Sequence, residues 1–187
     1  MTSSLRWLAD RMPGIPTIYV PGNHDFYRNG GPDGFTINSE IDDGRELAAK
    51  TGVHLLIDDT IELAGYRFLG STLWTDLRAC HSRDLAHACG EARRGMNDYR
   101  RIHRASSTRR SRRLQPSDTL AMHRRSWIFL SDQFRAGDAS RTIVVTHHAP
   151  SIASLRDPFE PLNQCYASDL NAEIRSCPST WWKLGCN

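Results

Sequence analysis

The pattern of apolar and polar positions in the first fifty residues predicts two helices separated by a strand. Apolar side chains recur at helical spacing over residues 3 to 12, where Ser3 or Ser4 can cap the helix. A Pro-Gly pair then stops this helix, and the apolar run over residues 15 to 20 predicts a buried strand. A second, short helix is expected from about residue 44 to residue 50.

After that helix, apolar and polar residues follow the spacing that is typical of β-strands. Gly52 is well placed to end the helix as the residue after its C-terminus. Three short strands are expected next, over residues 53–57, 60–63 and 66–69. Ala64 and Gly65 separate the last two strands, which predicts a tight hairpin between them.

The second half of the chain predicts one long helix and one strand. Ser117 can cap a helix that reaches about Phe134 and ends at Gly137. The β-branched run over residues 142 to 146 is typical of a strand buried on both faces. Helices that alternate with buried strands indicate a single α/β domain with at least two sheet segments.

The segment from residue 76 to residue 116 is the least regular part of the pattern and is rich in arginine. The simpler expectation is a solvated insertion. The alternative is a basic rim that attracts phosphorylated or nucleic-acid ligands. Tyr99 is the only Phe, Trp or Tyr residue in this segment, so a stacking platform for single-stranded nucleic acid is poorly supported.

Composition narrows the class of protein. A chain of 187 residues with 39% hydrophobic residues is long enough for one sizeable core. Its net charge of +3 does not by itself imply a nucleic-acid partner. No run approaches the ~18 apolar residues of a membrane span. Five irregularly spaced cysteines favour reduced thiols over a disulfide framework, which together with the lack of a signal-peptide pattern predicts a cytoplasmic location.

Chemically useful side chains follow both predicted buried strands. Asn23, His24 and Asp25 come just after the first strand, and His147 and His148 come just after the second. Ligands bind at the carboxyl ends of strands in open α/β sheets, so two such ends can share one site. An Asn oxygen can bind a hard metal, a His can transfer a proton near neutral pH, and an Asp can orient a His.

At this point the chain resembles the calcineurin-like metallophosphoesterases. Residues 20–25 match the family's G-N-H-[DE] motif, and residues 144–150 are similar to its later strand-plus-histidine motif. Residues 70–76 and 96–99 are similar to segments between these motifs in one bacterial branch of the family, and residues 166–170 to the helix start that follows. The resemblance covers roughly residues 1 to 171.

The resemblance implies a fold and a reaction. The fold would be α/β, a two-sheet β-sandwich flanked by helices. The family site holds two divalent metals, which activate a water that attacks phosphorus. By this resemblance Asn23 and His147 would bind one metal, which could be Mn, Fe or Zn. His24 would protonate the leaving oxygen or hold the phosphate, Asp25 would hydrogen-bond His24, and His148 would be a neighbour rather than a ligand.

The chain departs from the family pattern at both ends. The upstream D-x-H and G-D motifs and the downstream G-H-x-H motif are absent. We therefore expect a partial domain over residues 1–171 and an atypical tail over residues 172–187 that could be out of frame. With two ligands left, at most one metal would be held, and weakly.

Two functions from different classes remain open at this stage. One is a phosphate-ester hydrolase that is impaired in this chain. The other is a non-catalytic remnant that binds phosphate, a nucleotide or a partner. A nucleic-acid-binding module is less supported, because no recognition motif accompanies the arginines. Serine-hydrolase chemistry is less supported still, because no G-x-S-x-G occurs.

Overall fold

The structure is a computed structural model that describes residues 1–27, 35–79, 84–107, 111–155, 162–176 and 181–184. Three of the five cysteines, Cys80, Cys177 and Cys186, lie outside the described residues. The two described cysteines, Cys89 and Cys165, are both reduced thiols, as the sequence predicts. No helix in the described part of the chain is long and apolar enough to cross a membrane.

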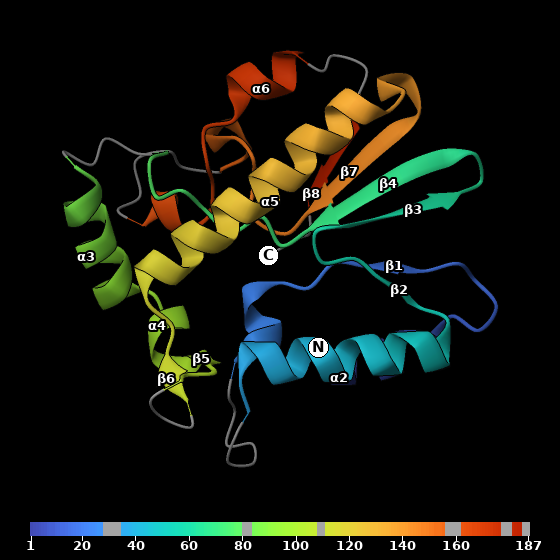
Figure 1. The fold of residues 1–187 in the computed structure, drawn as a ribbon, viewed down its shortest axis with the longest axis horizontal. Helices are drawn as coiled ribbons and strands as arrows, with labels where there is room; N and C mark the ends of the chain where they lie inside the picture. The colour runs from blue at the N-terminus through green and yellow to red at the C-terminus, as the bar shows by residue number, and fades with distance from the viewer. Residues whose placement is uncertain (28–34, 80–83, 108–110, 156–161, 177–180, 185–187) are drawn as a thin grey trace.

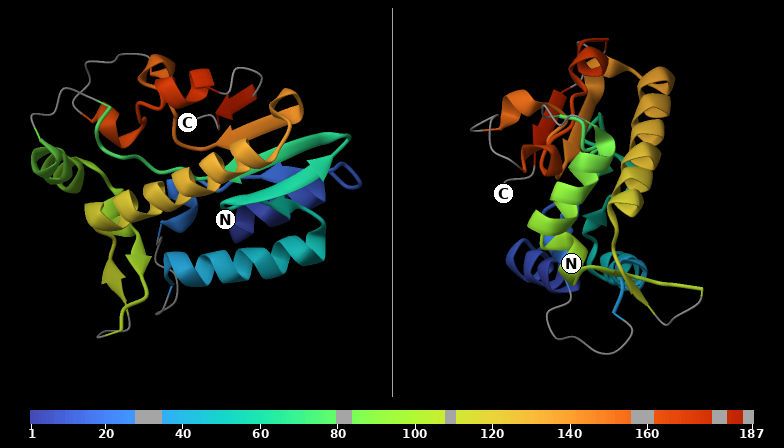
Figure 2. Two further views of the ribbon diagram at one scale, coloured as in Figure 1. Left: turned by 45° about the horizontal axis from the view of Figure 1, so that its top comes forward. Right: turned by 90° about the vertical axis from the view of Figure 1, so that its left-hand side faces the viewer.

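The first layer of the fold is a small parallel sheet covered by two helices. Its elements are α1 (Thr2–Arg11), β1 (Ile18–Tyr19), the 3₁₀ turn η1 (Asn23–Phe26), α2 (Ile37–Thr51) and β2 (His54–Leu55). Strands β1 and β2 pair in parallel, and α1 and α2 lie side by side against them (Figures 1 and 2). The site described below is at the carboxyl end of β1.

Three sequence predictions for this layer need correction. The first strand is shorter and less buried than expected: Ile18 and Tyr19 are half-buried and Ile15 is 55% exposed. Among the strands that the structure describes, β1 pairs only with β2. Helix α1 begins without a side-chain cap. Helix α2 starts seven residues earlier than expected, where the hydroxyl of Thr36 accepts a hydrogen bond from the Ser39 amide at 3.1 Å. The predicted C-terminal residue is correct, since Gly52 has a φ of 74°.

The second layer is a four-stranded mixed sheet. Its strands are β3 (Asp59–Leu63), β4 (Tyr66–Ser71), β7 (Thr142–Thr146) and β8 (Trp181–Leu184), in the order β3-β4-β7-β8. The β3–β4 hairpin turns at Ala64 and Gly65, as predicted, and both have a positive φ. Strand β7 runs parallel to both β4 and β8. The tail that the sequence marked as atypical therefore supplies one of the two edge strands of this sheet.

Helix α5 (Pro116–Ala136) crosses one face of this sheet (Figures 1 and 2). Leu130 of the helix is fully buried and belongs to one cluster with Leu69 of β4 and Val144 of β7, which are partners in the sheet register. The sequence predicted this helix but placed its start at Ser117. The cap is instead formed around Gln115, whose backbone N–H donates to the carboxylate of Asp118 at 2.9 Å.

The described part of the arginine-rich segment has more regular secondary structure than the sequence pattern predicted. It forms α3 (Leu85–Gly95), α4 (Asp98–Arg101) and a short hairpin of β5 (His103–Arg104) and β6 (Arg112–Arg113), which lie beyond one end of α5 (Figure 1). Ala88 and Ala92 are one helical turn apart and fully buried. Their small side chains give a weak apolar signal beside many arginines, which explains why the sequence pattern missed α3.

Short elements complete the fold. They are η2 (Ala139–Arg141), η3 (Ile152–Ser154), η4 (Asn163–Cys165) and α6 (Asn171–Ser176). The α/β class predicted from the sequence is confirmed, with helices packed on two sheet segments.

Candidate functional site

The carboxyl ends of β1 and β7 meet, as the sequence predicted. Nε2 of His147, directly after β7, lies 3.0 Å from Oδ1 of Asn23, the first residue of η1. Asn23 is 6% exposed and His147 is half-buried. The imidazole nitrogen and the amide oxygen therefore lie within hydrogen-bond distance of each other at the edge of the two sheets.

The segment after β4 holds these two ends together. The hydroxyl of Thr72 donates to the carbonyl of Pro21 at 2.8 Å. Its own carbonyl accepts the backbone N–H of His148 at 3.2 Å and the ring Nδ1–H of His148 at 3.1 Å. Leu73 and Trp74 follow with φ values of 64° and 51°, an unfavourable backbone for side-chain-bearing residues that the surrounding contacts must stabilise.

Gly22 is required by the close approach of the two strand ends. A β-carbon built at this position would lie 2.4 Å from Cε1 of His147, far inside van der Waals contact. The backbone N–H of Gly22 also donates to Oδ2 of Asp25 at 2.8 Å. The glycine of the motif therefore makes room for the imidazole that the Asn23 amide faces.

Asp25 does not bind His24, which corrects the expectation drawn from the family. One carboxylate oxygen accepts the hydroxyl of Tyr19 at 2.6 Å, and the other accepts the Gly22 N–H. Burial and this hydrogen bond raise the pKa of Tyr19. The exposed ring of His24 lies instead against Tyr27, with ring centroids 4.6 Å apart. Asp25 thus orders the loop rather than the imidazole of His24.

Asp98 is a site residue that the sequence analysis did not identify. It is 4% exposed, and its Oδ1 accepts two hydrogen bonds, from Nδ2 of Asn23 at 2.8 Å and from the hydroxyl of Tyr27 at 2.6 Å. Burial and the bond to Asp98 raise the pKa of Tyr27. The sequence contained one signal. Asp98 lies next to Tyr99 in residues 96–99, a segment similar to one found between the motifs in a bacterial branch of the calcineurin-like metallophosphoesterases.

The two histidines after β7 have different environments, and burial lowers the pKa of both. Burial lowers the pKa of His147, although the nearby charge of Asp25 opposes this shift. A neutral imidazole can offer a nitrogen to a metal. Burial lowers the pKa of His148 to about 3, and its ring stacks on Trp74 at 5.4 Å. His148 is therefore part of the packing, in agreement with its predicted place beside the site.

The site offers two donor atoms that a metal ion could use. Asn23 and His147 provide one oxygen and one nitrogen. Among the described residues, no group of three or more His, Cys, Asp or Glu side chains could hold a metal ion. Two ligands leave most coordination positions to water or substrate oxygens, which favours weak binding.

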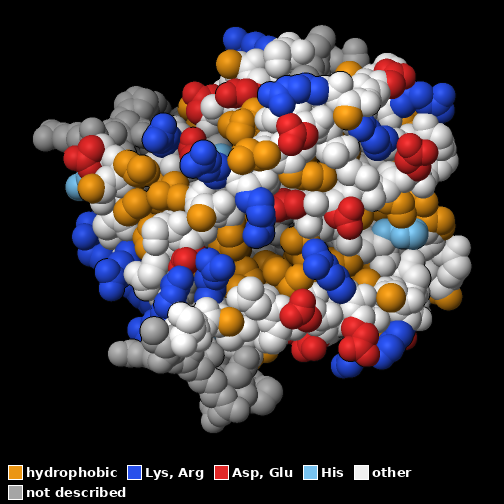
Figure 3. All heavy atoms as spheres, in the orientation of Figure 1, with side chains coloured by type: hydrophobic (Ala, Val, Ile, Leu, Met, Phe, Trp, Pro, Cys, Tyr) orange, Lys and Arg blue, Asp and Glu red, His pale blue; other side chains and the backbone are white. Residues whose placement is uncertain are grey.

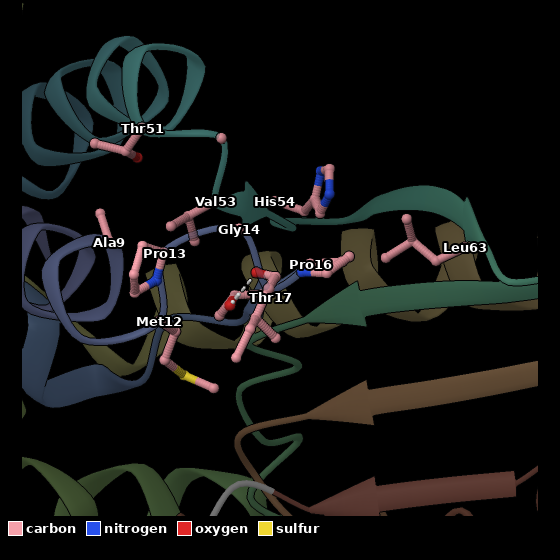
Figure 4. Close-up of a pocket in the computed structure, with 12 residues that line it drawn as sticks. Ala9, Met12, Pro13, Gly14, Pro16, Thr17, Thr51, Val53, His54 and Leu63 are labelled. Carbon is pink, nitrogen blue, oxygen red and sulfur yellow. Dashed lines mark hydrogen bonds between the residues drawn. The ribbon is translucent and has the colours of Figure 1, made fainter.

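A separate cavity of about 300 Å³ lies at the opposite ends of β1 and β2 (Figure 4). Met12, Pro13, Ile15 and Val53 contribute to a mainly apolar lining that includes one imidazole, that of His54, and no carboxylate. It is therefore distinct from the site around Asn23 and lacks its chemistry.

Lys and Arg side chains gather near α4, β5 and β6, at the lower left of the surface in Figure 3. Part of this charge is neutralised. Arg104 donates to Asp118 at 2.9 Å, and Arg112 makes two hydrogen bonds to the same carboxylate at 2.6 and 2.7 Å. Arg101 lies over the ring of Tyr27 at 4.8 Å, which brings one guanidinium to the edge of the candidate site.

Comparison with known proteins gives limited similarity in sequence and clear similarity in fold. No protein-family model matches the chain. The chain is 26% identical over 161 residues to an uncharacterized protein of Acanthamoeba polyphaga mimivirus, a match that covers 83% of this chain and 52% of the viral protein. The chain thus spans about half the length of that relative.

Among solved structures, the fold is similar to that of the phosphopantetheinyl hydrolase PptH from Mycobacterium tuberculosis. The TM-score is 0.68 at 17% sequence identity, with 96% of this chain and 65% of the mycobacterial chain covered. This likeness establishes a common fold, and the chain spans less than two thirds of the mycobacterial protein.

Proposed function

We propose that the chain carries a metal-dependent site that hydrolyses phosphate monoesters or diesters. The 3.0 Å approach of His147 Nε2 to Asn23 Oδ1 carries this proposal. An amide oxygen and a neutral imidazole form a mixed ligand set that Mn²⁺, Fe²⁺ and Zn²⁺ accept. The similar fold of a protein named as a phosphopantetheinyl hydrolase supports the reaction class.

Each site residue has a distinct role in this proposal. Asn23 and His147 would hold one divalent cation, which when bound polarises a phosphate oxygen and lowers the pKa of a bound water. His24, exposed beside this point, would donate a proton to the leaving oxygen. Asp25 would keep the loop in place through Gly22 and Tyr19.

A second candidate function is phosphate binding without turnover. It is favoured by the small number of ligands, because a weakly held cation activates water poorly. No product would form, but phosphate or a phosphate ester would still bind in a metal-dependent way. Assays on the same purified protein distinguish the two functions.

The test is hydrolysis of a chromogenic phosphodiester and a chromogenic phosphomonoester by the purified chain in excess Mn²⁺. We expect metal-dependent turnover that falls by roughly 10²–10⁴-fold in His24→Ala, the range typical of general acid catalysis. His87→Ala is the control, because His87 is an exposed histidine on α3. Equal rates for all three proteins would reject a catalytic role for His24. No turnover with Mn²⁺-dependent phosphate binding would select the second function.

A further inference from the structure

The Asn23 amide has two ends of nearly equal shape and opposite hydrogen-bonding character. The oxygen accepts hydrogen bonds and can bind a cation, whereas the NH₂ group only donates. The end of the amide that faces His147 is therefore decided by the partner at its other end. Here Oδ1 faces His147 and Nδ2 faces Asp98.

Asp98 distinguishes strongly between the two orientations. An ionised carboxylate has no proton to donate, so the NH₂ end of Asn23 satisfies it and the oxygen end would be repelled. The Nδ2–Oδ1 distance is 2.8 Å, and both residues are nearly fully buried, so water does not compete for this bond. A flipped amide would also turn its NH₂ group toward the ring of His147.

The carboxylate of Asp98 is itself held in place. The hydroxyl of Tyr27 donates to the same Oδ1 at 2.6 Å, and α4, which contains Asp98, packs against η1, which contains Asn23. Asp98 therefore has a fixed position from which to orient the amide.

We infer that Asp98 is a positioning residue that fixes the Asn23 amide with its oxygen toward the bound cation. This inference rests on the proposed function, because it assigns Asp98 a purpose in metal binding at the same site. In this proposal Asp98 is not itself a metal ligand. It acts through the hydrogen bond to Asn23.

The first arm of the test needs no metal. In ¹⁵N-labelled protein, Asn23→Ala identifies the side-chain amide signals of Asn23 by their loss. We expect these signals to exchange slowly with water in the wild type and in Asp98→Asn, whose side-chain oxygen still accepts the bond. We expect fast exchange in Asp98→Ala. Unchanged exchange in Asp98→Ala would overturn the inference.

The second arm measures Co²⁺ affinity by the visible absorption of the bound ion. We expect Asp98→Ala to bind at least about tenfold more weakly, while Asp98→Asn stays within about threefold of the wild type. Equal weakening in both variants would assign the effect to the lost charge and overturn the positioning role. Equal affinity of Asp98→Ala and the wild type would also overturn it.

Two further outcomes are separable. If the wild type binds no Co²⁺, the proposed function is rejected and the inference about the cation falls with it, whereas the exchange arm still decides whether Asp98 orients the amide. Removal of a buried carboxylate can destabilise the fold, so thermal unfolding is measured for each variant. Asp98→Asn then provides the comparison in a folded protein, with Tyr27→Phe as a second variant that retains the Asn23–Asp98 bond.

Discussion

Nε2 of His147 lies 3.0 Å from Oδ1 of Asn23, although 124 positions separate the two residues along the chain. The approach depends on three local features: a turn after β1, a parallel strand pair that carries β7 to the same edge, and a glycine at position 22. Each feature can be changed separately, and the glycine gives the most direct test.

Gly22→Ala is expected to displace the imidazole of His147. The added methyl would lie 2.4 Å from the ring, so the ring or the loop must move. We expect a loss of about 1–3 kcal/mol in the free energy of unfolding, as for overpacking in a core, together with loss of Co²⁺ binding. Gly90→Ala is the control, because its nearest neighbour is the end of the Arg94 side chain at 3.3 Å. Wild-type Co²⁺ affinity in Gly22→Ala would contradict the packing described for this loop.

The β3–β4 hairpin contains a residue whose replacement should stabilise the protein. Ala64 has a φ of 52°, in the left-handed region that Asn tolerates better than Ala. We expect Ala64→Asn to raise the free energy of unfolding by roughly 0.5–1 kcal/mol, measured by urea denaturation. The same substitution at the exposed helical residue Ala86 should lower stability slightly. A loss of stability in Ala64→Asn would argue against this turn.

Leu130 anchors α5 on the four-stranded sheet. It is fully buried, so Leu130→Ala should lower the free energy of unfolding by about 2–5 kcal/mol through lost burial and the cavity left behind. Ile128→Ala is the matched control on the same helix, where the side chain is 51% exposed. Denaturant unfolding of both variants measures the difference. Similar losses at the two positions would mean that α5 does not pack as described.

Asp118 should make stability depend on pH in the acid range. Burial raises the pKa of its carboxyl, but hydrogen bonds from Arg112 and Gln115 outweigh burial and lower the pKa overall. A carboxyl whose pKa is lower in the folded state stabilises the fold above its unfolded pKa of about 3.9, and this contribution is lost as pH falls through the folded value.

We therefore expect Asp118→Asn to be less stable than the wild type at pH 7 and the gap to shrink below about pH 4. Urea unfolding at a series of pH values measures this gap. Asp132→Asn is the control, because that side chain is 62% exposed and forms a surface pair with Arg135. A gap that stays constant down to pH 3 would show that Asp118 contributes through shape alone.

Local sequence signals correctly predicted the elements that are determined by residues close together in the chain. The Ala64–Gly65 turn, the end of α2 at Gly52, the body of α5 and all of β7 were correct, because turn chemistry and hydrophobic period act over a few residues. Helix α3 was missed, because small buried alanines resemble exposed positions among arginines. The length of β1 was overestimated, because pairing partners and not apolar character limit a strand.

The sequence by itself determined the α/β class, the Asn23 loop, and the expectation that His147 meets it, since residues directly after strands are placed by the strands. Only the tertiary structure decided the partners of these residues. It assigned Asp25 to Tyr19 and Gly22, and Asp98 to Asn23, because hydrogen-bond partners depend on distances of a few tenths of an ångström between distant segments. Sequence patterns specify which side chains are available at a strand end, and packing selects which of them touch.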